Sequence, residues 1–166
     1  RSLVFGYRRI QELPFPDWLD ATIAAFRRWG RNDAIPRRPL TPQVLPVQLQ
    51  RIGNVLIAAV PAEFTTTSGA RLRALIEREF RGCGIDRVIV QGYANSYAGY
   101  VTTPEEYARQ GYEGGCTHFG QWTLPAYLTA FRAISAKLLR GEPADALRPT
   151  PADADYLRAI RSRWRH

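Results

Sequence analysis

The sequence predicts an α/β fold in which a mixed sheet contains a β-α-β unit over about residues 54–93, with flanking helices, as part of a larger domain. Residues 55–60 form an apolar run of strand length, and residues 86–93 predict the next strand. The segment between them repeats apolar residues at the spacing of a helix, and a right-handed crossover makes the two strands parallel. A hydrophobic content of 45% over 166 residues is sufficient for a buried core.

The residues before this unit predict a short strand within 1–13, a helix over 18–30 and a loop over 31–46. Aromatic residues recur at helical spacing in the helix, and Gly30 ends it. The loop is rich in proline, which cannot donate to a helix or sheet ladder.

Residues 46–60 predict two strands joined by a turn at 52–54. The second strand is continuously apolar, which is typical of a strand buried on both faces. Thr66, Thr67 or Ser68 is expected to cap the helix that follows. The apolar positions of this helix share one face: Leu72, Leu75, Ile76 and Phe80. Gly82 and Gly84 are expected to end the helix.

After the strand at 86–93, the sequence predicts a short helix or turn over 104–110 and a glycine-rich loop over 111–120. An amphipathic helix is expected over 123–141. Residues 142–166 are expected to form a polar linker and a basic tail, outside a domain that covers 1–141.

The formal net charge of +8 admits nucleic acid or an anionic membrane surface as a partner. The arginines are spread along the chain, however, so solvated faces are the favoured interpretation and nucleic acid is not an expected partner. No apolar run reaches the length that crosses a bilayer. Cys83 and Cys116, together with two histidines, match no zinc-finger spacing, and either a disulfide or two free thiols fits them.

A carboxylate and several phenols follow the two strands of the β-α-β unit. Glu63 comes directly after the first strand, and a cluster of tyrosines comes after the second: Tyr97, Tyr100, Tyr107 and Tyr112. Because parallel strands end at one edge of a sheet, these groups are expected to meet there, as part of a metal or acid–base site. The structural alternative is a glutamate satisfied by helix N–H groups, beside tyrosines that only pack.

A self-contained zinc site is not predicted. His118 is the only histidine in the interior of the sequence, and zinc is normally held by three or four protein ligands. Nucleotide-binding glycine loops, HExxH and GxSxG are all absent.

Several segments resemble the neutral/alkaline non-lysosomal ceramidases. Residues 60–66 read VPAEFTT, where that family shows VPGEFTT, and 67–73 read TSGARLR against MAGRRLR. The family's NxYxxYVTTxEEY run corresponds to 95–107, its YEGASTLFG segment to 112–120 and its TLxAY to 123–127. His118 occupies a position that is usually apolar in the family.

The resemblance implies a zinc-dependent amidase that hydrolyses the N-acyl bond of ceramide to sphingosine and a fatty acid. In such enzymes two histidines, a glutamate and a tyrosine hold zinc, which activates a water molecule. The glutamate corresponds to Glu63 and the tyrosine ligand to Tyr100, with Tyr97 as second choice. Tyr112 corresponds to the tyrosine that stabilises the developing oxyanion.

Because the family's two histidine ligands belong to an earlier part of its catalytic domain, this chain resembles the C-terminal half of that domain. A missing N-terminal catalytic segment or a companion chain is expected to supply the histidines, and the isolated chain is expected to be inactive. Ceramide or a related sphingolipid, contact with a membrane surface and a secreted or periplasmic location are implied by resemblance. The alternatives are a degenerate relative, a non-catalytic basic binding module and a structural subunit that completes another chain's sheet.

Overall fold

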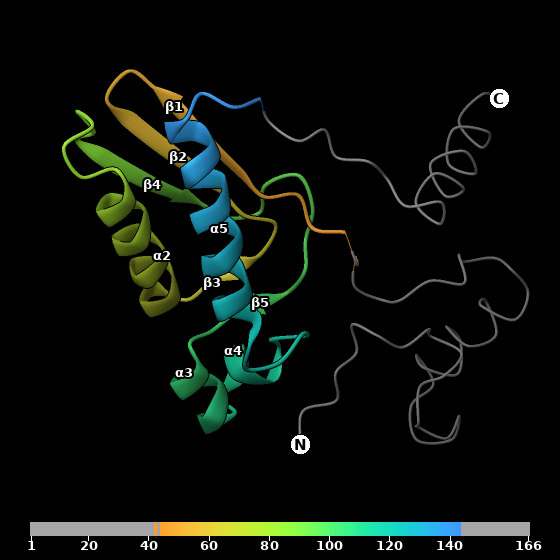
Figure 1. Ribbon diagram of the computed structural model, residues 1–166. Helices are drawn as coiled ribbons and strands as arrows, with labels where there is room; N and C mark the ends of the chain where they lie inside the picture. Colours follow the sequence, from red (N-terminus) through yellow and green to blue (C-terminus); the bar gives the residue numbers. More distant parts are fainter. Residues whose placement is uncertain (1–41, 43, 144–166) are drawn as a thin grey trace, which may run out of the picture.

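The computed structural model describes residues 42 and 44–143 of the chain. The expected strand in 1–13, the helix over 18–30 and the basic tail lie outside the described residues. The described part is an α/β arrangement of two small sheets and four helices (Figure 1).

A hairpin opens the main sheet. Strands β1 (Gln48–Ile52) and β2 (Val55–Ala59) pair antiparallel, with Ile52 opposite Val55. The two-residue connection places Gly53 at φ 60°, a left-handed conformation that glycine adopts without steric penalty. The turn lies where the sequence predicted it.

The predicted β-α-β unit follows. Helix α2 (Thr66–Glu79) crosses from β2 to β4 (Arg87–Gln91), which pairs parallel with β2. The cap is Thr65, one residue before the expected candidates, because the Thr65 side chain accepts the N–H of Ser68 at 3.2 Å. The strand order β1-β2-β4 makes a mixed sheet, as predicted.

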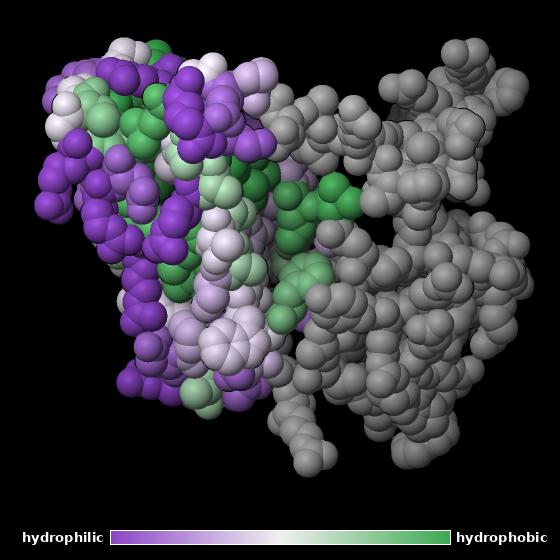
Figure 2. Space-filling view, in the orientation of Figure 1, coloured by the Kyte–Doolittle hydropathy of each residue, from purple (hydrophilic) through white to green (hydrophobic). Residues whose placement is uncertain are grey.

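Helices α2 and α5 (Thr123–Leu139) lie side by side over one face of this sheet (Figure 1). The core between them is formed by apolar side chains of the sheet and both helices, among them Leu49, Leu56, Ala58, Val88, Leu72, Ile76, Leu124 and Phe131. Figure 2 shows hydrophilic side chains over the solvent-facing side of α2 and paler ones over α5.

The opposite face of the sheet is more open than the sequence predicted. Along β2, Leu56 and Ala58 are buried, but Val55, Ile57 and Ala59 are only partly buried. The expectation of a strand buried on both faces is therefore wrong for the described residues, because both helices pack on the same side.

A second, two-stranded sheet was not predicted. Strands β3 (Glu63–Phe64) and β5 (Tyr100–Val101) pair parallel just beyond the ends of β2 and β4. Helices α3 (Pro104–Arg109) and α4 (Tyr112–Gly115) follow β5. The prediction of a loop over 111–120 is corrected at its start, where α4 makes one helical turn.

Among the described residues, no helix combines the length and the apolar character that crossing a bilayer requires.

Candidate active site

The candidate site lies at the edge of the main sheet where the parallel strands β2 and β4 end. There, β3 places Glu63 directly opposite Tyr100 of β5. The N–H of Glu63 donates to the carbonyl of Gly99 at 3.0 Å, and the N–H of Thr65 donates to that of Val101 at 3.1 Å. These bonds bring the two segments that carry the glutamate and the tyrosine into register.

The loop over 92–99 is fastened to the chain just before Glu63. The N–H groups of Tyr93, Ala94 and Ala98 donate to the carbonyls of residues 62, 60 and 61 at 3.3, 3.0 and 2.8 Å. Tyr93 and Asn95 adopt left-handed conformations, with φ of 56° and 65°, that non-glycine residues rarely take. The backbone bonds therefore impose a tight turn that brings the loop's tyrosines over Glu63.

Three tyrosine hydroxyls surround the carboxylate of Glu63. The hydroxyl of Tyr97 donates to Glu63 Oε1 at 2.5 Å. Hydrogen bonds from Tyr93, Tyr97 and Tyr100 lower the pKa of Glu63, the largest effect coming from Tyr93. Glu63 is thus an ionised carboxylate at neutral pH.

The same contacts keep the phenols protonated. The hydrogen bond to Glu63 is the main cause that raises the pKa of Tyr97 to about 12, and it also raises the pKa of Tyr93 and of Tyr100. A protonated phenol can donate to the ionised carboxylate, as the hydroxyl of Tyr97 does.

Aromatic contacts extend the cluster on both sides. The rings of Tyr93 and Tyr97 are stacked, with centroids 5.7 Å apart and planes 7° apart. The ring of Tyr112, at the start of α4, meets that of Tyr100 edge to face at 5.6 Å. Tyr112 is 73% exposed to solvent.

The structure brings together the predicted residues Glu63, Tyr97, Tyr100 and Tyr112. Tyr93, which sequence reasoning missed, joins them. It looked like the last residue of a strand at 86–93, but β4 ends at Gln91 and Tyr93 belongs to the loop. Its place one residue after Gly92, at the carboxyl end of a strand, was the signal that could have found it.

Tyr107, the remaining tyrosine of the predicted cluster, lies on α3 rather than on the Glu63 edge.

His118 packs behind this edge. A Cβ at Gly99 would lie 2.9 Å from His118 Nδ1 and 2.7 Å from the carbonyl oxygen of Cys116, so glycine is required where the histidine abuts β5. Burial lowers the pKa of His118, which favours the neutral imidazole. Cys83 and Cys116 are both free thiols.

A hydrogen-bond network of threonines and a glutamate connects the elements that carry the site. Glu106 Oε2 accepts the hydroxyl of Thr65 at 2.8 Å and the N–H of Thr103 at 2.9 Å. The Thr103 hydroxyl in turn accepts the N–H of Glu106 at 3.2 Å, which completes a capping box. Glu106 therefore joins the start of α2, next to β3, to the start of α3, next to β5.

Ser68 is part of the same support rather than a nucleophile. Its side chain is fully buried, and its hydroxyl donates to the carbonyl of Val101 at 2.6 Å. This bond links α2 to β5 and leaves no accessible Oγ for chemistry.

The oxygen donors at the Glu63 edge match part of a zinc ligand set. In the described part of the chain, no group of three or more His, Cys, Asp and Glu side chains is placed to hold a metal. One ionised carboxylate beside accessible phenols nevertheless fits part of a zinc ligand set, in which an oxygen ligand usually accompanies histidine or cysteine. A depression lined by Tyr100 and residues of β3, α3 and α4 opens beside this edge.

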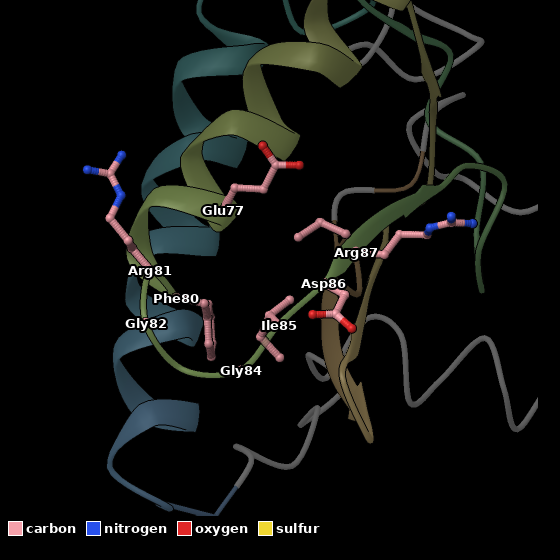
Figure 3. A pocket seen from close by; sticks show the side chains of 9 residues that line it. Glu77, Phe80, Arg81, Gly82, Gly84, Ile85, Asp86 and Arg87 are labelled. Atoms are coloured by element: carbon pink, nitrogen blue, oxygen red, sulfur yellow. The ribbon is translucent and has the colours of Figure 1, made fainter.

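A second depression lies at the other end of the β-α-β unit, between α2 and the start of β4 (Figure 3). Phe80 and Ile85 face each other across it, whereas the guanidinium groups of Arg81 and Arg87 point to opposite sides. It lacks the convergent polar groups that orient a ligand, so the Glu63 edge is the stronger candidate.

Comparisons with known proteins converge on one family. The model of the neutral/alkaline non-lysosomal ceramidase family, N-terminal part, matches residues 30–129. A neutral ceramidase of Pseudomonas aeruginosa is 46% identical over 107 residues, which are 64% of this chain and 16% of that protein. A neutral ceramidase of Mycobacterium tuberculosis is 39% identical over 120 residues, which are 70% of this chain and 19% of that protein.

Solved structures agree. The crystal structure of the neutral ceramidase from Pseudomonas aeruginosa superposes with a TM-score of 0.65 and 44% identity, over 69% of this chain and 18% of that chain. A structure described as a ceramidase complexed with C2 gives the same values. The α/β fold prediction is confirmed, and the chain spans less than a fifth of the length of these relatives.

Proposed function

The chain belongs to the neutral/alkaline non-lysosomal ceramidase family, and from this premise we propose that its Glu63 edge is part of an amidase centre. The reaction is hydrolysis of the N-acyl bond of ceramide to sphingosine and a fatty acid. The observation that carries the proposal is the pairing of Glu63 with Tyr100 on adjacent strands, with the Tyr112 ring against Tyr100.

Glu63 and Tyr100 would hold a zinc ion together with two histidines from other parts of the catalytic domain. When bound, zinc would polarise the amide carbonyl and lower the pKa of water. The carboxylate of Glu63 suits this role because it is ionised and lies at an accessible strand end. Tyr100 suits it because the parallel register fixes its backbone beside that of Glu63.

Tyr112 is proposed to act on the substrate. As water adds to the amide carbon, negative charge develops on the carbonyl oxygen, and a phenolic O–H can donate to it. Tyr112 is exposed, and its contact with Tyr100 keeps its ring beside the Glu63 edge.

A segment exchange tests the proposal. The matched segment of the Pseudomonas aeruginosa neutral ceramidase is replaced by the corresponding residues of this chain, and release of fatty acid from a fluorescent ceramide is measured. We expect hydrolysis by the exchanged protein, a loss to background with Glu63→Gln and a reduction of kcat by about 10²–10³-fold with Tyr112→Phe.

Glu77→Gln is the matched control, because Glu77 is an exposed glutamate on α2 away from the Glu63 edge. A folded exchanged protein whose hydrolysis is unaffected by Glu63→Gln would refute the proposal.

A further inference from the structure

Two tyrosines of the loop over 92–99 converge on Glu63 without being needed as ligand or oxyanion donor. We propose that Tyr97, supported by Tyr93, is a positioning residue that holds the Glu63 carboxylate in one orientation. The inference rests on the proposed function, since it concerns how the glutamate of that centre is presented.

Glu63 needs such a device because it is only partly buried. A glutamate side chain has several rotatable bonds, and at an accessible strand end it exchanges among rotamers unless a partner fixes it. The hydroxyl of Tyr97 is that partner: it donates to Glu63 Oε1 at 2.5 Å, a short bond to a charged acceptor. Groups that hydrogen-bond a ligating carboxylate orient it and tune its affinity for metal.

Tyr97 is itself held in place. Its ring lies parallel to that of Tyr93 at 5.7 Å, and both residues belong to a loop tied by backbone hydrogen bonds to residues 60–62. The side-chain amide of Asn95 donates to Gln48 Oε1 at 3.1 Å, which anchors the middle of the loop to β1.

Left-handed conformations at Tyr93 and Asn95 carry a conformational cost. They persist only where the surroundings fix them, and such positions cluster at functional sites. The loop is therefore built to keep the stacked pair over the carboxylate.

This geometry also separates the roles of Tyr97 and Tyr100. Both phenols interact with Glu63, but they reach it from different elements: Tyr97 donates to Oε1 from the loop over 92–99, whereas Tyr100 lies opposite Glu63 in the strand register. Tyr97, the second choice as a ligand, is thereby assigned to orienting Glu63, and Tyr100 keeps the ligand role.

The test uses the full chain with Tyr97→Phe, which keeps the ring for stacking and removes only the hydroxyl. Tyr127→Phe is the matched control: it makes the same change at a buried hydroxyl that has no hydrogen-bond partner within the described structure. Two quantities are measured. The first is the rotamer averaging of the Glu63 side chain, from NMR couplings of the full chain without metal. The second is the Kd for zinc alone, by competition with a chelator, of the segment-exchanged ceramidase that carries the same substitutions and supplies the histidines.

We expect a single Glu63 rotamer in the unsubstituted chain and in Tyr127→Phe, and averaged couplings in Tyr97→Phe. We also expect Tyr97→Phe to weaken zinc binding by about 10–100-fold, with Tyr127→Phe unchanged. A single Glu63 rotamer that persists in Tyr97→Phe would overturn the inference. It would also be overturned if Tyr97→Phe left the zinc Kd unchanged while Glu63→Gln abolished zinc binding.

Discussion

Glu63 combines a partly exposed position with hydrogen bonds from several phenols to its carboxylate. Hydrogen bonds from Tyr93, Tyr97 and Tyr100 favour the ionised form, so the pKa of Glu63 lies below its ordinary value of 4.5. Because the folded-state pKa is lowered, the stabilisation is fully present above the unfolded-state pKa. It is lost as the pH falls through the lower, folded-state value.

This sign can be tested by carboxyl ¹³C NMR of glutamate-labelled protein. The titration of Glu63 should have its midpoint below 4.5, and Tyr97→Phe should move that midpoint upward, because one donor to the charged form is gone. In Tyr127→Phe the midpoint should stay where it is. A midpoint for Glu63 that does not respond to Tyr97→Phe would contradict the role given to the hydrogen bond.

The sequence predicted most of the residues around Glu63 because they follow strands that run in the same direction. Glu63 and the tyrosines at 97, 100 and 112 follow parallel strands, so the strand-end rule placed them together before any contact was known. Tyr93 escaped because its left-handed backbone conformation depends on bonds to residues 60 and 62, which the local sequence does not encode.

At the scale of the elements, Glu106 connects the starts of two helices. It caps α3 through Thr103 and also accepts the hydroxyl of Thr65, the N-cap of α2. Its carboxylate is partly buried; burial raises its pKa, but hydrogen bonds from Thr103, Thr65 and Thr67 outweigh this and lower it overall.

Glu106→Ala should therefore lower the free energy of unfolding by about 1–3 kcal/mol, because it leaves two helix starts without their shared acceptor. The neighbouring Glu105→Ala is the control. Glu105 forms an ion pair with Arg71 at 3.0 Å in which both side chains are exposed, and its loss should change stability by no more than about 1 kcal/mol. Urea denaturation measures the free energy of unfolding of both variants. Equal losses in the two would show that the shared cap adds no more stability than the exposed ion pair.

Apart from α3, which was expected as a short helix or turn over 104–110, the elements that the sequence predicted are those with a long-range pattern. The hairpin, α2, β4 and α5 each carry several apolar positions at one period. Strands β3 and β5 have two residues each, too few for a period to appear. Helix α4 contains two glycines, which disfavour helix locally, so tertiary contacts with α3 must stabilise it.

At the scale of the described molecule, one face of the main sheet is not covered by helices and exposes apolar side chains. Ile89 of β4 lies beside Ile57 of β2 in the strand register and is 40% exposed. Ile52, at the end of β1, belongs to the same face and is 63% exposed. Because parallel strands in α/β proteins are usually covered on both faces, this surface is suited to pack against further polypeptide.

The full chain, purified alone, should consequently bind a hydrophobic dye such as ANS. Replacing Ile89 by Gln should reduce dye fluorescence by removing part of the apolar face. Leu139→Gln serves as the comparison, because Leu139 is similarly exposed, at 45%, but ends α5 on the other side of the sheet. Equal fluorescence in the two variants would show that this face is not the binding surface.

The central claim is that Glu63 and Tyr100 form half of a zinc amidase centre. The most direct measurement is native mass spectrometry of the segment-exchanged Pseudomonas aeruginosa ceramidase, without substitution and with Glu63→Ala combined with Tyr100→Phe. We predict one zinc ion per molecule in the first protein and its loss from the second, with the fold unchanged by circular dichroism. Zinc retained in full by the doubly substituted protein would mean that the metal is held elsewhere, and would contradict the claim.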